Sequence, residues 1–290
     1  MENKYVIITD STCDLDYQFV KDNNIEVMNM HFRIDGKEYI HYLDFRELSF
    51  KDFYEKLNIL KEASTSQLNF MDIKACYEKY LKEGYDILSI SFSSALSGTY
   101  NTCRLVAEEL REEFKDRKIE ILDSLCASAG EGLFVYYANL YKNQGFSLEE
   151  NVRKLLELRP HLCHWFTVSD IDLLKKGGRV SSSKAVAAKM LRIKPVLHVS
   201  NEGKLIPRQN KIGRKLALKC LADEFDKRVD RSFKQMVFIC HADCIDDANY
   251  VKDLVMQYAD CEVKILDMGP VIGSHAGNGT VAVFFVGKER

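Results

Sequence analysis

Long apolar segments are missing from this sequence of 290 residues. The longest uninterrupted apolar stretch, residues 281–286, has only the length of a β-strand. Because a membrane-spanning helix needs about 20 apolar residues, no such helix is expected. The start of the chain also lacks a basic segment followed by an apolar one, which would mark a secretory signal. We therefore expect a cytoplasmic protein.

Blocks of basic residues are also missing. The 41 lysines and arginines are balanced by 43 aspartates and glutamates, which leaves a formal net charge of −2. Proteins that bind nucleic acid usually concentrate positive charge on one face or along one helix. The even balance argues against a nucleic acid partner.

Paired C-x-x-C motifs are absent, although the chain has nine cysteines. An odd number of cysteines without an export signal indicates reduced thiols. Two groups mix cysteine and histidine: His161, Cys163 and His164, and Cys240, His241 and Cys244. Neither has zinc-knuckle spacing, and Cys163 and Cys240 lie in apolar, strand-like runs where cysteine acts as a small hydrophobic residue. We therefore predict no metal site.

Signatures of common catalytic sites are missing as well. The chain has no G-x-S-x-G nucleophile elbow and no P-loop. Gly130-Glu131-Gly132 lacks the third glycine of a dinucleotide-binding loop. The carboxylates look scattered, without a paired acid and base. The sequence thus predicts a protein that is not an enzyme and uses no cofactor.

What the sequence does contain is an ordinary globular balance, with 46% apolar and 29% charged residues. In the first half, short apolar runs alternate with helical patterns, which predicts a mostly parallel, Rossmann-like sheet covered on both faces. After about residue 158 a predicted hairpin interrupts this alternation, which predicts a mixed sheet. We therefore expect an α/β fold with two domains, residues 1–157 and residues 158–290.

The expected elements follow from these patterns. Strands are predicted at residues 5–9, 25–34, 86–92, 119–122, 165–168, 195–200, 204–207, 237–240, 263–266 and 281–286. Helices are predicted at residues 70–82, 100–114, 132–142, 182–191 and 211–228, and after the capping residues Ser49 and Ser147. Asp35-Gly36 is a hairpin turn signal, and residues 64–67 are expected to form a polar loop.

One turn stands out as a possible ligand site. Residues 93–99, Ser-Ser-Ala-Leu-Ser-Gly-Thr, lie between a predicted buried strand and a helix. Ligands of open α/β sheets collect where strands end and helices begin, and the free N–H groups of a helix N-terminus favour an anion. Ser97 could donate a further hydrogen bond, although the serines could equally serve only as helix caps.

Three other segments carry weaker signals. The hydroxyl-rich residues 64–67 resemble many ordinary turns. The basic loop at residues 175–179 could bind an anion, or Gly177 could simply end a helix. His275 lies in a glycine-rich stretch at residues 273–279, where the backbone is accessible.

Taken together, these stretches resemble the DegV family over essentially the whole chain. The matching motifs are Thr-Asp-Ser-Thr-Cys-Asp-Leu at residues 9–15, Thr-Ser-Gln at 65–67, Leu-Ser-Gly-Thr at 96–99, Lys-Lys-Gly-Gly-Arg at 175–179, Ile-Lys-Pro at 193–195 with Gly-Lys at 203–204, and residues 270–279. Their order along the chain makes the resemblance specific.

The resemblance implies a two-domain α/β protein that holds one long-chain fatty acid between its domains. It further implies the role of the fatty-acid-binding subunit of a bacterial fatty acid kinase, which phosphorylates the bound acid for phospholipid synthesis. By their positions in the motifs, Thr65 and Ser97 would hydrogen-bond the carboxylate, and His275 and Arg179 would complete the polar network. Ser66 and Ser94 would be neighbours of this group.

The sequence departs from the family pattern at a few positions. Leu68 and Asn278 stand where the family usually has proline. The family often carries Arg-Thr-Arg in a region thought to contact the kinase, and the first of these arginines aligns with Ile212. Arg208 or Arg214 could take over that contact.

The two ends of the expected ligand should contribute differently to its binding. Hydrogen bonds to a charged group contribute roughly 1.5–3 kcal/mol each, whereas a long tail offers on the order of 10 kcal/mol at about 0.8 kcal/mol per buried CH₂. The tail is therefore expected to set the affinity and the polar residues the register. Two other functions stay open: an acyl hydrolase using Ser97 and His275, and a lipid-independent regulatory module with the same fold.

Overall fold

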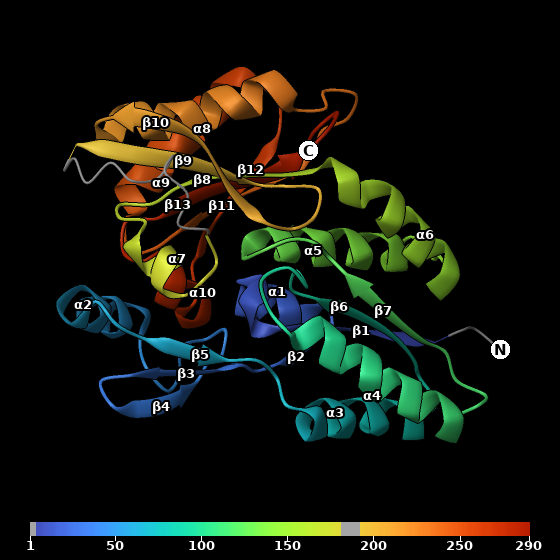
Figure 1. The fold of residues 1–290 in the computed structure, drawn as a ribbon. Coiled ribbons are helices and arrows are strands. Elements are labelled where there is room, and N and C mark those ends of the chain that lie inside the picture. The colour runs from blue at the N-terminus through green and yellow to red at the C-terminus, as the bar shows by residue number, and fades with distance from the viewer. Residues whose placement is uncertain (1–3, 181–191) are drawn as a thin grey trace.

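The structure is a computed structural model that describes residues 4–180 and 192–290. Its first half contains a four-stranded parallel sheet in the order β2-β1-β6-β7, made of Glu26–Met28, Tyr5–Asp10, Asp86–Ser91 and Ile119–Asp123. Every residue of β1 and β6 is buried, as is typical of parallel strands covered on both faces. Helices α3 (Phe70–Lys82) and α4 (Thr99–Glu113) cover one face, and α5 (Ala129–Asn143) and α6 (Leu148–Leu158) cover the other (Figure 1).

A small antiparallel sheet extends from this half in the order β4-β3-β5, made of Lys37–Ile40, His31–Ile34 and Ser64–Ser66. Asp35 and Gly36 join β3 to β4 with positive φ angles of 56° and 69°, as a tight hairpin turn requires. The expectation of a loop at residues 64–67 was wrong for β5, which pairs with β3 and places Thr65 opposite Phe32. A neighbouring strand decides this pairing, so the local polar sequence does not reveal it.

The second half is built on a six-stranded mixed sheet in the order β10-β9-β8-β13-β11-β12. Its strands are Leu205–Ile212, Ile193–Val199, Leu162–Thr167, Val281–Val286, Met236–His241 and Glu262–Asp267. Only the pair β11–β12 is parallel. The predicted mixed sheet and its β9–β10 hairpin are therefore confirmed.

The remaining helices are α1 (Tyr17–Asp22), α2 (Phe50–Leu60), α7 (Asp172–Lys176), α8 (Arg214–Arg228), α9 (Ile245–Tyr258) and α10 (Pro270–Ala276), with short 3₁₀ turns at Ser11–Cys13 and Arg159–His161. The predicted capping box at Ser147 is present. The helix expected over residues 211–228 begins later, because β10 continues to Ile212. Helix α9 was not predicted, and the helix expected over residues 182–191 lies outside the described residues.

Along the strands of the mixed sheet, successive side chains point to opposite faces and so belong to two separate apolar cores. On β13, Ala282 and Phe284 face inward, whereas Val283 and Phe285 pack against α8 and α9 on the outer side. The inner core is continuous with that of the parallel sheet. Helix α5 joins the two halves, because it contacts β1 and β6 as well as β8, β11 and β13 (Figure 1).

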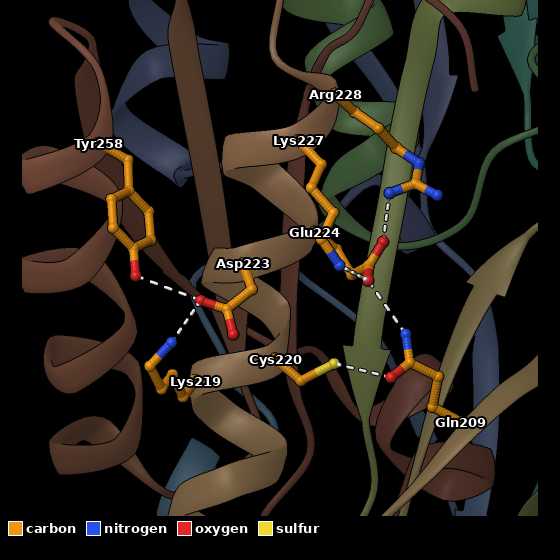
Figure 2. A network of polar contacts seen from close by, with 8 residues as sticks. All are labelled: Gln209, Lys219, Cys220, Asp223, Glu224, Lys227, Arg228 and Tyr258. Carbon is orange, nitrogen blue, oxygen red and sulfur yellow. Dashed lines mark hydrogen bonds and ion pairs between the residues drawn. The ribbon is translucent and has the colours of Figure 1, made fainter.

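A polar network fixes the outer helix α8. Figure 2 shows buried Glu224 accepting hydrogen bonds from Gln209 of β10 at 3.0 Å, from Lys227 at 2.9 Å and from Arg228. Burial alone would raise the pKa of Glu224, but the hydrogen bond from Lys227 and the charge of Arg228 outweigh it and lower that pKa. The guanidinium of Arg228 also lies 4.6 Å from the ring centroid of Trp165, so the network anchors α8 to the sheet.

The boundary predicted near residue 157 falls in the last turn of α6, and β8 begins at Leu162. The parallel and three-stranded sheets lie wholly before it and the mixed sheet wholly after it. A division into residues 1–157 and 158–290 stays a proposal. None of the helices in the described ranges combines the length and the apolar character that a bilayer crossing needs.

Candidate ligand-binding site

A cavity of about 520 Å³ lies where the three sheets meet. Its wall draws on β5, on the turn between β6 and α4, on the inner face of the mixed sheet and on α10. This volume is in the range of small-molecule sites. Within residues 4–180 and 192–290, no group of three histidine, cysteine, aspartate or glutamate side chains is placed to hold a metal ion.

All six residues singled out in the sequence line this cavity. Thr65 and Ser66 come from β5, Ser94 and Ser97 from the turn before α4, Arg179 from the segment after α7, and His275 from α10. The structure thus brings together residues up to 210 positions apart. Their role in binding a carboxylate stays a prediction.

His275 and Thr65 form the centre of this polar end. The Oγ1 atom of Thr65 lies 2.9 Å from Nε2 of His275. Burial, reinforced by the positive charge of Arg179, lowers the pKa of His275 to about 4. His275 is therefore neutral at physiological pH, with one nitrogen as a donor and the other as an acceptor. A Cβ atom on Gly177 would come within 2.5 Å of Nδ1 of His275, so a glycine there gives the imidazole its space.

The N-terminus of α4 forms a second part of the polar end. Ser97 and Asn101 line the cavity beside it. Gly98, the N-cap residue of α4, has no side chain that could cap the helix. The amide of Thr99 donates a hydrogen bond to Oγ of Ser97 over 3.3 Å. A Cβ atom on Gly98 would lie 2.0 Å from the side-chain oxygen of Gln67, so this glycine allows the loop after β5 to approach the helix. The arrangement leaves helix N–H groups and the dipole available for an anion.

Arg179 supplies the positive charge of the site. It is partly buried, and its side chain donates to the carbonyl oxygens of Leu96, at 3.3 Å from Nε, and of Gly177. Burial lowers its pKa, but a guanidinium stays charged in proteins. Gly177 also ends helix α7. The basic segment therefore serves both as a helix end and as part of the cavity wall.

Beyond this end the wall is mostly apolar. Side chains from both halves of the fold contribute: Met30, Phe92, Phe166, Leu174, Val199, Leu205, Met268, Val271, Ile272, Ala282 and Phe284. Such a surface suits a hydrocarbon chain. Thr12, Ser128, His164 and Thr280 also line this part of the cavity, and none of them was among the predicted site residues.

Three buried carboxyl groups lie behind Thr12 and Ser128, so the expectation of scattered carboxylates was wrong here. Thr12 hydrogen-bonds both Asp10 and, at 3.0 Å, Glu131, and Oγ of Ser128 donates to Asp14 over 2.6 Å. Burial raises the pKa of each acid, that of Asp14 to about 8. These groups hold the turn after β1 against the start of α5. A sequence signal was available in the dense polar run after β1.

Fold and cavity together define an α/β protein with a candidate ligand site between a parallel and a mixed sheet. The chain matches the family model described as "Uncharacterised protein, DegV family" over residues 4–288. The protein belongs to the DegV family, as the sequence motifs predicted.

Similar proteins cover the whole chain. A DegV domain-containing protein of Clostridium perfringens is 43% identical over 288 residues, which is 99% of this chain and 99% of the relative. A solved structure from Thermotoga maritima, described as a DegV lipid binding protein, has a TM-score of 0.87 at 29% identity and covers 99% of both chains. DegV of Bacillus subtilis, described as a fatty acid binding protein, has a TM-score of 0.84 at 26% identity and covers 98% of this chain and 99% of its own.

Proposed function

We propose that this protein is a cytoplasmic carrier that binds one long-chain fatty acid and presents the carboxylate to a fatty acid kinase. The observation that carries the proposal is a single cavity with a cationic, hydroxyl-rich end and long apolar walls. Thr65, Ser97, His275 and Arg179 would hold the carboxylate, with Ser66 and Ser94 beside them. The solved relatives described as lipid or fatty acid binding proteins support this assignment.

The location of the polar end supports presentation to a partner. Ser66 and Ser94 line the cavity and are also exposed to solvent. A carboxylate held between them would lie close to the molecular surface, while the tail would point into the apolar interior. That orientation is the one that a phosphorylating enzyme requires.

The geometry is less suited to an acyl hydrolase. Nε2 of His275 lies against Thr65, whereas Oγ of Ser97 lies 3.1 Å from Thr99. Among the described residues, the hydrogen bonds of His275 include none to a carboxylate. A nucleophilic serine requires a base within hydrogen-bond reach and a third group that orients the base. The arrangement therefore favours binding of a carboxylate over attack on an ester.

Removing one hydroxyl from the polar end is expected to weaken binding. Thr65→Ala and Ser97→Ala should each raise the Kd for oleate by roughly 10- to 100-fold, because each removes a hydrogen bond to a charged group. Ser64→Ala is a matched control, since Ser64 is exposed on the same strand as Thr65 and does not line the cavity. Native mass spectrometry of the purified proteins, followed by lipid extraction, measures the bound acid.

The wild-type protein should carry a stoichiometric fatty acid. If it stays empty after incubation with oleate and palmitate, the carrier function is wrong and a regulatory module is favoured. If all three alanine variants bind like the wild type, the carboxylate lies elsewhere.

The surface around Ile212 is the proposed contact with the kinase. Ile212 and Leu216 are exposed by 73% and 56%. The two arginines that could have replaced the family's basic residues have partners within the chain: Arg214 pairs with Asp247 at 2.7 Å, and Nε of Arg208 lies 2.8 Å from Nε2 of His198. We therefore propose an apolar rather than a basic contact with the kinase.

Ile212→Glu should slow acyl-phosphate formation by a fatty acid kinase and ATP by roughly tenfold, because a carboxylate would have to lose its water at the contact. The Kd for oleate should not change. Ile59→Glu on α2 is the control, since Ile59 is exposed by 79% on another helix. Equal rates for the two variants would exclude this surface as the contact.

A further inference from the structure

The cavity has a second polar region, away from the proposed carboxylate site. It consists of Thr12, Ser128 and His164, which share the wall with apolar side chains such as Phe92 and Phe284. A saturated hydrocarbon tail would gain nothing from these groups.

The second polar region lies far along the cavity. Thr280, just before β13, donates to the carbonyl oxygen of Ala276 over 2.9 Å and so lies beside the helix that carries His275. Phe284 is four residues further along β13, about 13 Å at 3.3 Å per residue, and His164 is its partner on β8. One acyl chain spans half of a bilayer core, about 15 Å. His164 is therefore level with the distal part of a bound chain.

Within this region, His164 is the residue whose polar atoms lack hydrogen-bond partners in the part of the chain that the structure describes. Only 2% of its surface is exposed, and neither ring nitrogen has a hydrogen-bond partner among the described residues. Its ring packs 5.3 Å from that of Phe284 and against Gly130. Burial, with a smaller effect of the Arg290 charge, lowers the pKa of His164 well below its usual value. The ring is thus neutral and can both donate and accept, and buried polar groups normally have such partners.

The two hydroxyl groups of this region, on Ser128 and Thr12, are already fixed by carboxyl groups. Ser128 donates its proton to Asp14, and Thr12 is bonded to Asp10 and Glu131. A hydroxyl oxygen whose proton is committed can still accept a hydrogen bond. A ligand hydroxyl in this part of the cavity would therefore meet an acceptor on Ser128 or Thr12 and an imidazole without a partner.

We propose that the preferred ligand is a long-chain fatty acid with a hydroxyl group in the distal half of its chain, recognised by His164 together with Ser128 and Thr12. This inference rests on the proposed carrier function and adds the chemical class of the ligand to it. The carboxylate end would fix the position of the ligand along the cavity and so bring its hydroxyl to His164.

Ricinoleate and oleate test the proposal, because they differ only in a hydroxyl in the distal half of the chain. The Kd of the wild type should be roughly tenfold lower for ricinoleate, since one buried polar group gains a partner. An acid hydroxylated beside the carboxyl group should show no such gain. His164→Phe keeps an aromatic ring without nitrogen, and its Kd for ricinoleate should be no lower than its Kd for oleate.

The wild-type comparison needs no variant, so it stands even if His164→Phe does not fold. Binding of oleate without any preference for ricinoleate would overturn this inference and leave the carrier function in place. A preference that persists in a folded His164→Phe would show that His164 does not read the hydroxyl. Failure of both acids to bind would overturn the carrier function as well.

Discussion

Ala282→Phe is expected to abolish binding of oleate while the protein still folds. Ala282 lies on the inner face of β13, where it pairs with Phe166 of the neighbouring strand β8. Its side chain is 3% exposed and lines the cavity. A benzyl group at this position would occupy the space that the tail needs. Excluding only four methylene groups would cost about 3 kcal/mol, or more than 100-fold in affinity.

The size of the new side chain should set the size of the effect. Ala282→Val adds two methyl groups and should weaken binding less than the phenylalanine variant. Because the added atoms enter a cavity rather than a filled core, the melting temperature of the empty protein should fall little, in contrast to ordinary overpacking, which costs about 1–3 kcal/mol. Native mass spectrometry and thermal unfolding measure both quantities. A folded Ala282→Phe protein with stoichiometric oleate would show that the tail occupies another place.

The polar end of this cavity could be predicted because its parts have local signatures. The small residues before α4 follow a buried strand and precede a helix, so the end of the sheet could be assigned from the sequence. Thr65 and His275 have no such signature of their own. Their 210-residue separation is closed only by the pairing of β5 with β3 and the docking of α10 against both, so only the family resemblance brought them together.

The deep part of the cavity could not be predicted in the same way. Glu131 and His164 are a charged and a polar residue that lie one position before the predicted helix at residues 132–142 and the predicted strand at residues 165–168. Both are at most 2% exposed, and residues of these types are rarely buried so fully without partners. Their burial follows from the packing of α5 between two sheets, which is a property of the tertiary structure. Local pattern also missed β5, whose three residues form a strand only because β3 lies beside them.

The buried carboxyl groups behind the cavity predict an unusual dependence of stability on pH. Asp14 is 3% exposed and accepts hydrogen bonds from Ser128 and from the amide of Gly269, at 2.9 Å. Burial nevertheless raises its pKa to about 8, helped by the negative charges of Asp10 and Asp267. The folded protein therefore keeps this proton at pH values where the unfolded chain, with a pKa of about 3.9, has lost it.

The sign of the effect follows from proton linkage. Between about pH 4 and pH 8 Asp14 binds more protons in the folded state than in the unfolded state, so its contribution to the free energy of unfolding falls as the pH rises. The contribution of Asp14 is complete below the unfolded pKa and is lost as the pH rises to the folded pKa of about 8. At about 1.4 kcal/mol per pKa unit, the loss over about four units is roughly 6 kcal/mol at most.

Asp14→Asn is therefore expected to stabilise the protein at alkaline pH. The amide has the shape of the acid, can accept the Gly269 hydrogen bond and donate to Ser128, and carries no charge to be desolvated. Urea unfolding at about pH 5 and pH 9 should show a small difference from the wild type at the lower pH and a gain of several kcal/mol at the higher one. Asp16→Asn, two residues away at a partly exposed position, is the control and should not reproduce the gain at the higher pH. A stability difference between Asp14→Asn and the wild type that is the same at both pH values would show that Asp14 is ionised in the folded state, with its charge compensated by the hydrogen bonds from Ser128 and Gly269.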